Sequence, residues 1–232
     1  VSDFCDETIA LFDEELKNSD IQKSFLIRKH EFEAKREKLS QNDINICLVG
    51  TYSSGKSTFI NAMIGKRILP ESINSETAKM FRIQDSQKPA VAFNLKTSEA
   101  DSNVRVVINW SAEKGKFIFS ANGDCPLTEK KIDGEINSAL VFHLQQHEQL
   151  SNILKCLNDI PNAFTEEYPE YIDGIIEVSF PIPIDKNISF TFYDTPGTDS
   201  NSNEHLLVLQ KALQQQTNSI LIILYEPTKM EG

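Results

Sequence analysis

The sequence predicts an α/β protein built on a mixed β-sheet that is flanked by helices. The apolar run 44–49 is followed at once by a loop bounded by Gly50 and Gly55, and helix-compatible residues continue from 57 to 64. This order of strand, loop and helix is typical of an α/β fold. Three further segments have the alternating or continuous apolar pattern of strands, namely 175–180, 188–193 and 220–225.

The first forty residues have the pattern of amphipathic helices. Residues 3–40 place apolar side chains at spacings of three and four, and Ser19 or Asp20 is expected to cap a second helix after a break. The apolar face that this spacing creates needs something to pack against. That is either this chain's own domain or a helix from further along a longer chain. We therefore divide the chain into a helical segment, 1–40, and a domain, 41–232.

The middle of the chain is expected to alternate strands and helix. Two hairpins are predicted within 80–120, joining 81–83 to 91–93 and 104–110 to 116–119. Residues 128–159 are predicted as one helix with Thr128 at its N-cap, and 206–216 as another. Two prolines follow 175–180, which places that strand at an edge of the sheet.

Two histidines on the predicted helix 128–159 have a spacing that could place both on one metal ion. His143 and His147 are four residues apart, and Glu148 is nearby. Two ligands on one helix do not close a tetrahedral site, so we interpret them as part of a polar helix face.

Composition excludes several classes of protein. The net charge of −11 argues against a chain-wide nucleic-acid surface, which would need clustered Lys and Arg. No run of 18 apolar residues exists, so nothing is expected to span a membrane by itself. Four scattered cysteines favour reduced thiols in a cytoplasm over a disulfide framework.

A phosphate-binding pattern occupies the loop after the first strand. Residues 50–57 read GTYSSGKS and match G-x-x-x-x-G-K-[ST] at every fixed position. Such a P-loop turns backbone N–H groups inward, and the next helix adds about half a positive charge at its N-terminus. Lys56 can span the β- and γ-phosphates, and the Ser57 hydroxyl can coordinate Mg²⁺. The expected phosphate-binding residues are Gly50, Tyr52, Ser53, Ser54, Gly55, Lys56, Ser57 and Thr58.

A second motif, D-x-x-G, begins at Asp194 directly after the predicted strand 188–193. Alone it is weak, because Asp and Gly are common in turns, but downstream of a P-loop it becomes a specific pair. Asp194 would hold Mg²⁺ through a water, and the Gly197 amide would sense the γ-phosphate.

A nucleotide switch also needs a hydroxyl from a loop that is held only while the γ-phosphate is present. Thr77 lies between the P-loop helix and the next strand, as required, with Thr51, Thr58 and Ser75 as competitors. The expected Mg²⁺ set is therefore Ser57, Thr77 and Asp194.

Together these residues resemble the dynamin superfamily, and bacterial dynamin-like proteins in particular. The resemblance is carried by 52–65, Leu69-Pro70, Thr77 and 194–197, and it extends over the rest only in outline. It implies a P-loop NTPase fold of the GTPase-like type. It also implies Mg²⁺-dependent GTP hydrolysis at the β–γ bond, coupled to self-assembly.

The resemblance implies roles for individual residues as well. Ser53 would help to bind a monovalent cation, K⁺ or Na⁺, that stabilises transition-state charge in place of an arginine finger. Thr77 would bind Mg²⁺ and position the attacking water, so the expected catalytic residues are Ser53, Thr77 and Gly197. The implied partners are GTP, GDP and a second copy docked across the nucleotide face. Membrane contact would come through regions outside this chain, which places the protein in the cytoplasm or at the periphery of a membrane.

The sequence departs from the family's pattern in several places. Residues 84–174 are long for a minimal GTPase and are expected to form an α+β insertion. Tyr52 stands where the namesake dynamins have Gln. Thr198 stands where Ras-like enzymes place a Gln, which the dynamins also lack.

The base-reading motif [NT]-K-x-D of GTPases is missing. Residues 228–231 resemble it but come one strand too early, so we expect the domain to be incomplete at its C-terminus. Two alternatives therefore stay open. One is a dynamin relative that hydrolyses ATP. The other is a nucleotide-gated scaffold with little hydrolysis that docks partners through 3–40 and 128–159.

Overall fold

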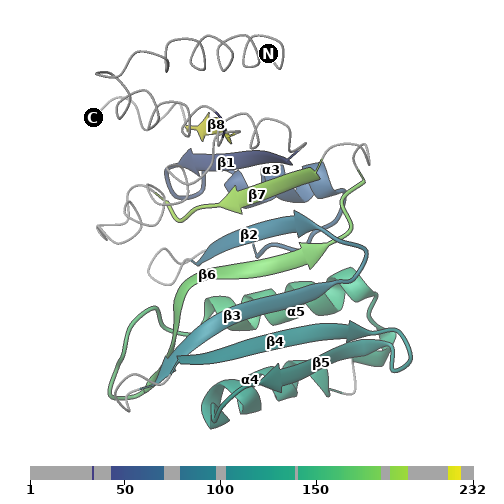
Figure 1. The fold of residues 1–232 in the computed structure, drawn as a ribbon, viewed down its shortest axis with the longest axis vertical. Helices are drawn as coiled ribbons and strands as arrows, with labels where there is room; N and C mark the ends of the chain where they lie inside the picture. Colours follow the sequence, from purple (N-terminus) through teal and green to yellow (C-terminus); the bar gives the residue numbers. More distant parts are fainter. Residues whose placement is uncertain are drawn as a thin grey trace, which may run out of the picture.

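The computed structural model describes most of the domain (Figure 1). The described residues are 33, 43–70, 79–97, 103–138, 141–183, 189–197 and 219–225. Several predictions lie outside them, namely the helices within 1–40 and over 206–216, the roles of Ser75, Thr77 and Thr198, and the segment 228–231.

Within the described residues, the strands form one mixed sheet in the order β5-β4-β3-β6-β2-β7-β1-β8. The strands are β1 (Asp43–Gly50), β2 (Met80–Asp85), β3 (Ala90–Thr97), β4 (Asn103–Ser111), β5 (Lys116–Ala121), β6 (Glu170–Phe180), β7 (Ser189–Asp194) and β8 (Ser219–Leu224). The helices are α3 (Lys56–Ile64), α4 (Pro126–Ile136) and α5 (Gln146–Asn158), with a 3₁₀ turn at Val141–His143. None of these helices is long and apolar enough to cross a bilayer. The α/β class and the mixed sheet are confirmed.

The helices α3, α4 and α5 lie on one face of the sheet (Figure 1). Their apolar side chains join those of the strands in a single core. Its largest fully buried side chains include Phe93, Phe117, Phe192, Ile60 and Leu150. Each such side chain stabilises the fold by roughly 1.5–3 kcal/mol relative to exposure. This core fixes the sheet and α3, which carry the site described below.

The other face of the sheet carries ion pairs along β2, β3, β4 and β6. Arg105 contacts Glu177 at 2.7 Å, Arg82 contacts the same carboxylate at 3.6 Å, and Lys96 contacts Asp173 at 2.8 Å. These side chains are about a third to a half exposed. Each pair therefore adds little to stability, about 0–1 kcal/mol.

The predicted hairpin between 81–83 and 91–93 is wrong. β6 lies between β2 and β3, parallel to β2 and antiparallel to β3. The hairpin of β4 and β5 is confirmed, and β3 also pairs antiparallel with β4. The sequence signals a turn directly after β2, but β3 does not return to pair with β2. β6, which begins only at Glu170, lies between them.

The predicted edge position of 175–180 is wrong for a related reason. β6 is an interior strand, flanked by β3 and β2. Pro181 and Pro183 follow its last residue, Phe180, so no backbone donor is missing within the strand. A proline excludes a central position only where it interrupts the ladder of hydrogen bonds.

The predicted single helix 128–159 is two helices joined by a 3₁₀ turn. His143 lies in that turn and His147 in the first turn of α5, so they do not share a helix face. A capping box begins α5, where Glu148 Oε2 accepts the backbone N–H of Gln145 at 2.7 Å. The polar run that begins at Gln145 therefore starts a new helix instead of continuing α4.

Thr128 is not the N-cap of α4. It is buried in the first turn, and Cys125 holds the N-cap position without a capping side chain. The carboxylate of Glu170, from the start of β6, accepts the N–H groups of Leu127 at 3.0 Å and Thr128 at 2.7 Å. A buried acid from a distant strand thus satisfies the helix N-terminus, which a local pattern could not reveal.

Candidate functional site

The predicted P-loop joins β1 to α3. β1 ends at Gly50, and Gly55 precedes α3 with φ 89°, a left-handed conformation that favours glycine. No side chain caps this helix N-terminus and its first turn holds no acid, an arrangement suited to an anion. A Cβ on Gly50 would lie 2.0 Å from the Leu224 carbonyl oxygen of β8, so only glycine fits there.

Lys56 is buried inside this loop. Its Nζ donates to the carbonyl oxygens of Gly50 at 3.0 Å and Thr51 at 2.8 Å. Ser53 adopts φ 61°, a left-handed conformation that costs a non-glycine residue about 1–2 kcal/mol. Strain of this kind is commonly kept where a loop serves a ligand.

Asp194, the last residue of β7, meets the start of α3. Its Oδ2 accepts the Ser57 hydroxyl at 2.6 Å. Burial raises the pKa of Asp194 to about 6, although the Ser57 hydrogen bond and the charge of Lys56 act to lower it. Its Oδ1 is buried and has no hydrogen-bond partner among the described residues.

This pair fits a hard divalent cation. A buried carboxylate oxygen without a partner is costly, and a cation bound there would remove that cost. Carboxylate and hydroxyl oxygens are the donors that Mg²⁺ prefers. Ser57 and Asp194 therefore have the donor chemistry of the predicted metal site.

The sheet brings the two motifs together. β7 runs parallel to β1, with Asp194 opposite Leu48, so both motifs leave the same edge of the sheet. Ligands of open α/β sheets bind at this carboxyl edge. The Thr195 hydroxyl donates to the Leu48 carbonyl oxygen at 2.6 Å and fixes the chain that follows Asp194. This role of Thr195 was not anticipated.

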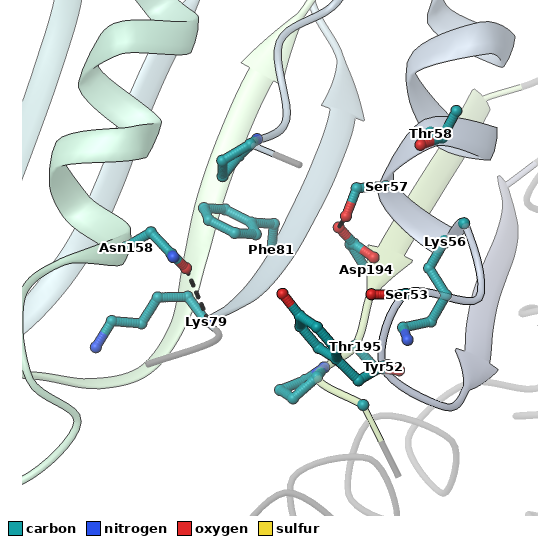
Figure 2. Close-up of a pocket in the computed structure, with 14 residues that line it drawn as sticks. Tyr52, Ser53, Lys56, Ser57, Thr58, Lys79, Phe81, Asn158, Asp194 and Thr195 are labelled. Carbon is teal, nitrogen blue, oxygen red and sulfur yellow. Dashed lines mark hydrogen bonds between the residues drawn. The ribbon is translucent and has the colours of Figure 1, made fainter. Parts of the chain in front are cut away.

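A cavity of about 430 Å³ opens between these loops (Figure 2). Its lining residues are Tyr52, Ser53, Gly55, Lys56, Ser57, Thr58, Pro70, Lys79, Phe81, Asn158, Asp194, Thr195, Pro196 and Gly197. Eight of the predicted site residues thus share one cavity. Gly50 lies behind it against β8, and the buried Ser54 hydroxyl lies beside Gly50. Thr77 is outside the described residues.

Three lining residues that the sequence did not predict form what we call the distal wall: Lys79, Phe81 and Asn158. In Figure 2 they lie on the opposite side of the cavity from Lys56 and Ser53, and the side chain of Lys79 extends away from these two residues. Lys79 is only 4% exposed, and burial lowers its pKa to about 7. No local pattern marks them, because the wall is assembled from β2 and the end of α5.

Asn61 is a further missed residue, within α3. Its Oδ1 accepts the N–H groups of Ile68 at 3.0 Å and Leu69 at 2.9 Å, and its Nδ2 donates to the Leu69 carbonyl at 3.1 Å. These bonds hold the chain that leads to Pro70 on the cavity wall. A polar residue between Ile60 and Ile64 on a buried helix face was the signal that could have revealed it.

Fold and site together define an α/β protein with a P-loop at the carboxyl edge of a mixed sheet. A family model described as the dynamin family matches residues 46–231, most of the chain. The chain belongs to the dynamin family.

Individual relatives are similar over part of their length. Dynamin-like protein A of Bacillus subtilis (strain 168) is 38% identical over 186 residues, which cover 75% of this chain and 16% of that protein. Two chains from solved structures of an oligomerised bacterial dynamin pair also align. One is 17% identical, with a TM-score of 0.39, over 88% of this chain and 29% of its own. The other is 16% identical, with a TM-score of 0.41, over 96% and 28%.

Proposed function

We propose that the chain is the GTP-binding part of a dynamin-like GTPase and that the complete protein hydrolyses the β–γ bond of GTP with Mg²⁺. The observation that carries this proposal is the contact of Ser57 with Asp194 beside the buried Lys56, at the mouth of a P-loop. Membership of the dynamin family supports guanine over adenine as the base.

The described residues suggest how the phosphates would be held. The start of α3, with no acid and no capping side chain, would face the phosphates, and Lys56 would exchange its carbonyl partners for phosphate oxygens. Ser57 and Asp194 would hold Mg²⁺, which neutralises the charge that develops on the β- and γ-oxygens. Gly197, on the cavity wall, would sense the terminal phosphate.

The remaining parts of the proposal rest on the family resemblance. Thr77 would complete the metal site and position the attacking water, and Ser53 would contribute to a K⁺ or Na⁺ site. A second copy would dock across the nucleotide face. Membrane contact would lie in regions outside these residues, and the protein would work in the cytoplasm or at a membrane periphery.

Phosphate release by the full-length protein tests the proposal. We expect turnover of GTP with Mg²⁺ that greatly exceeds turnover of ATP and that rises per molecule with protein concentration, because dimers complete the site. An ATP turnover rate equal to or higher than that of GTP would contradict the assignment of guanine as the base. Triphosphate binding with a flat, near-zero rate would favour a nucleotide-gated scaffold.

A further inference from the structure

The distal wall lies beyond Asp194 as seen from the P-loop. β2, which carries Phe81 and follows Lys79, is the neighbour of β7 on the side away from β1. Moving across the sheet from β1 to β7 to β2 therefore leads from the P-loop, past Asp194, to the distal wall (Figure 1). Under the proposed function Asp194 holds Mg²⁺ and Gly197 senses the terminal phosphate, so this wall, which lies beyond Asp194, is on the terminal-phosphate side.

A short stretch at the end of α5 holds Lys79 in place. Asn158 Oδ1 accepts the Lys79 backbone N–H at 3.3 Å, as the dashed line in Figure 2 marks. The ammonium of Lys79 donates to the Pro161 carbonyl at 2.9 Å and to the side chain of Asn162. Residues 158–162 thus bind both the main chain and the side chain of Lys79.

The other end of this connection is firmly packed. α5 contributes five side chains to the core that it shares with α4 and the sheet: Leu150, Ile153, Leu154, Cys156 and Leu157. The buried Gln149 amide donates to the carbonyls of Gly115, Val141 and Leu144. Densely packed interiors transmit strain, so we expect a shift at the end of α5 to reach α4.

We propose that Asn158 is a positioning residue through which the α4–α5 layer sets the rate of turnover: it fixes Lys79, and with it the distal wall beside the terminal phosphate. This inference rests on the proposed function. It gives residues 84–174 a role, since the end of α5 is where this long segment reaches the cavity. If the terminal phosphate lies beside the distal wall, its presence should also reach the end of α5 through the contact of Asn158 with Lys79.

The first test is the substitution N158L in the full-length protein, which removes the acceptor at nearly constant size. Loss of one hydrogen bond that positions the distal wall is expected to lower kcat about fivefold, while KM and nucleotide affinity stay within about twofold. N109L is the matched control, because Asn109 is exposed on β4, outside the α4–α5 layer, and does not line the cavity. It should leave kcat unchanged. A kcat for N158L within twofold of the parent would overturn the inference.

Hydrogen exchange on the parent protein supplies a second test that needs no variant. With Mg²⁺ and a non-hydrolysable GTP analogue, amides of 79–81 and 156–162 should exchange more slowly than with Mg²⁺ and GDP. Equal exchange in the two states, with both nucleotides bound, would overturn the inference alone. Failure of the parent to bind either nucleotide would overturn the proposed function as well.

Discussion

The hydroxyl of Ser57 donates a 2.6 Å hydrogen bond to Oδ2 of Asp194, although the two residues lie 137 positions apart in the sequence. The parallel pairing of β1 with β7 produces this contact, because it aligns Leu48 with Asp194. Two motifs that are separate in the sequence thereby become one site.

Replacing Lys56 by alanine should abolish triphosphate binding. Its ammonium lies within the P-loop, held by two backbone carbonyls, and no other cation is found on the P-loop side of the described cavity. A fluorescent GTP analogue should bind K56A at least about 100-fold more weakly, since hydrogen bonds between charged partners are among the strong ones. K66A is the matched control, because Lys66 is exposed just after α3. If the two variants bind alike, the role of Lys56 is wrong.

Asp194 should make the stability of the metal-free protein depend on pH. Burial raises its pKa from 3.8 to about 6, so between these values the native carboxyl holds a proton that the unfolded chain has released. The free energy of unfolding must then fall as pH rises through this window. D194N removes the titration, so this variant should lose less stability than the parent between about pH 4 and 6. Urea unfolding in EDTA measures both curves, and parallel curves would contradict this account of Asp194.

Two glycine substitutions should have opposite effects. G50A places a methyl group 2.0 Å from the Leu224 carbonyl and should destabilise the fold by about 2 kcal/mol or more, because β1 and β8 must separate. G134A adds a methyl group on α4 that meets nothing within 4 Å and should stabilise by about 0.5–1 kcal/mol. Urea unfolding of both variants checks the pair. A G50A protein as stable as the parent would show that β1 and β8 do not approach this closely.

Thr195→Val should weaken both stability and nucleotide binding. It deletes the 2.6 Å hydrogen bond to Leu48 at almost constant volume, which costs about 1 kcal/mol and releases the chain that leads to Gly197. T191V is the control, because Thr191 lies on β7, the strand that leads to Thr195, but does not line the cavity. Equal analogue affinity for T195V and T191V would speak against a positioning role for this hydroxyl.

Local signals in the sequence predicted the core of the site. The strand before Gly50, the helix after it and the D-x-x-G at Asp194 each depend on neighbours within a few residues, and the structure has all three elements. The apolar run 220–225 was likewise a sufficient signal for β8. These elements could be predicted from the sequence, because apolar periodicity and the residue preferences of turns are local properties.

The errors and omissions share a different cause. β6 between β2 and β3, Glu170 at the start of α4 and Asn158 beside Lys79 are all contacts between residues far apart in the chain. A lysine just before a strand gives no local sign that the end of a distant helix will bury it. The order of strands in the sheet, and a helix cap supplied by a distant residue, follow from tertiary packing. Local patterns in one sequence do not encode that packing.

The most direct test of the central claim is a calorimetric titration of the full-length protein with a non-hydrolysable GTP analogue, with Mg²⁺ and again in EDTA. We predict one site per chain whose affinity falls at least tenfold when Mg²⁺ is removed, since Ser57 and Asp194 would then lack the cation they are arranged to hold. No binding in either condition, or equal binding in both, would contradict the account.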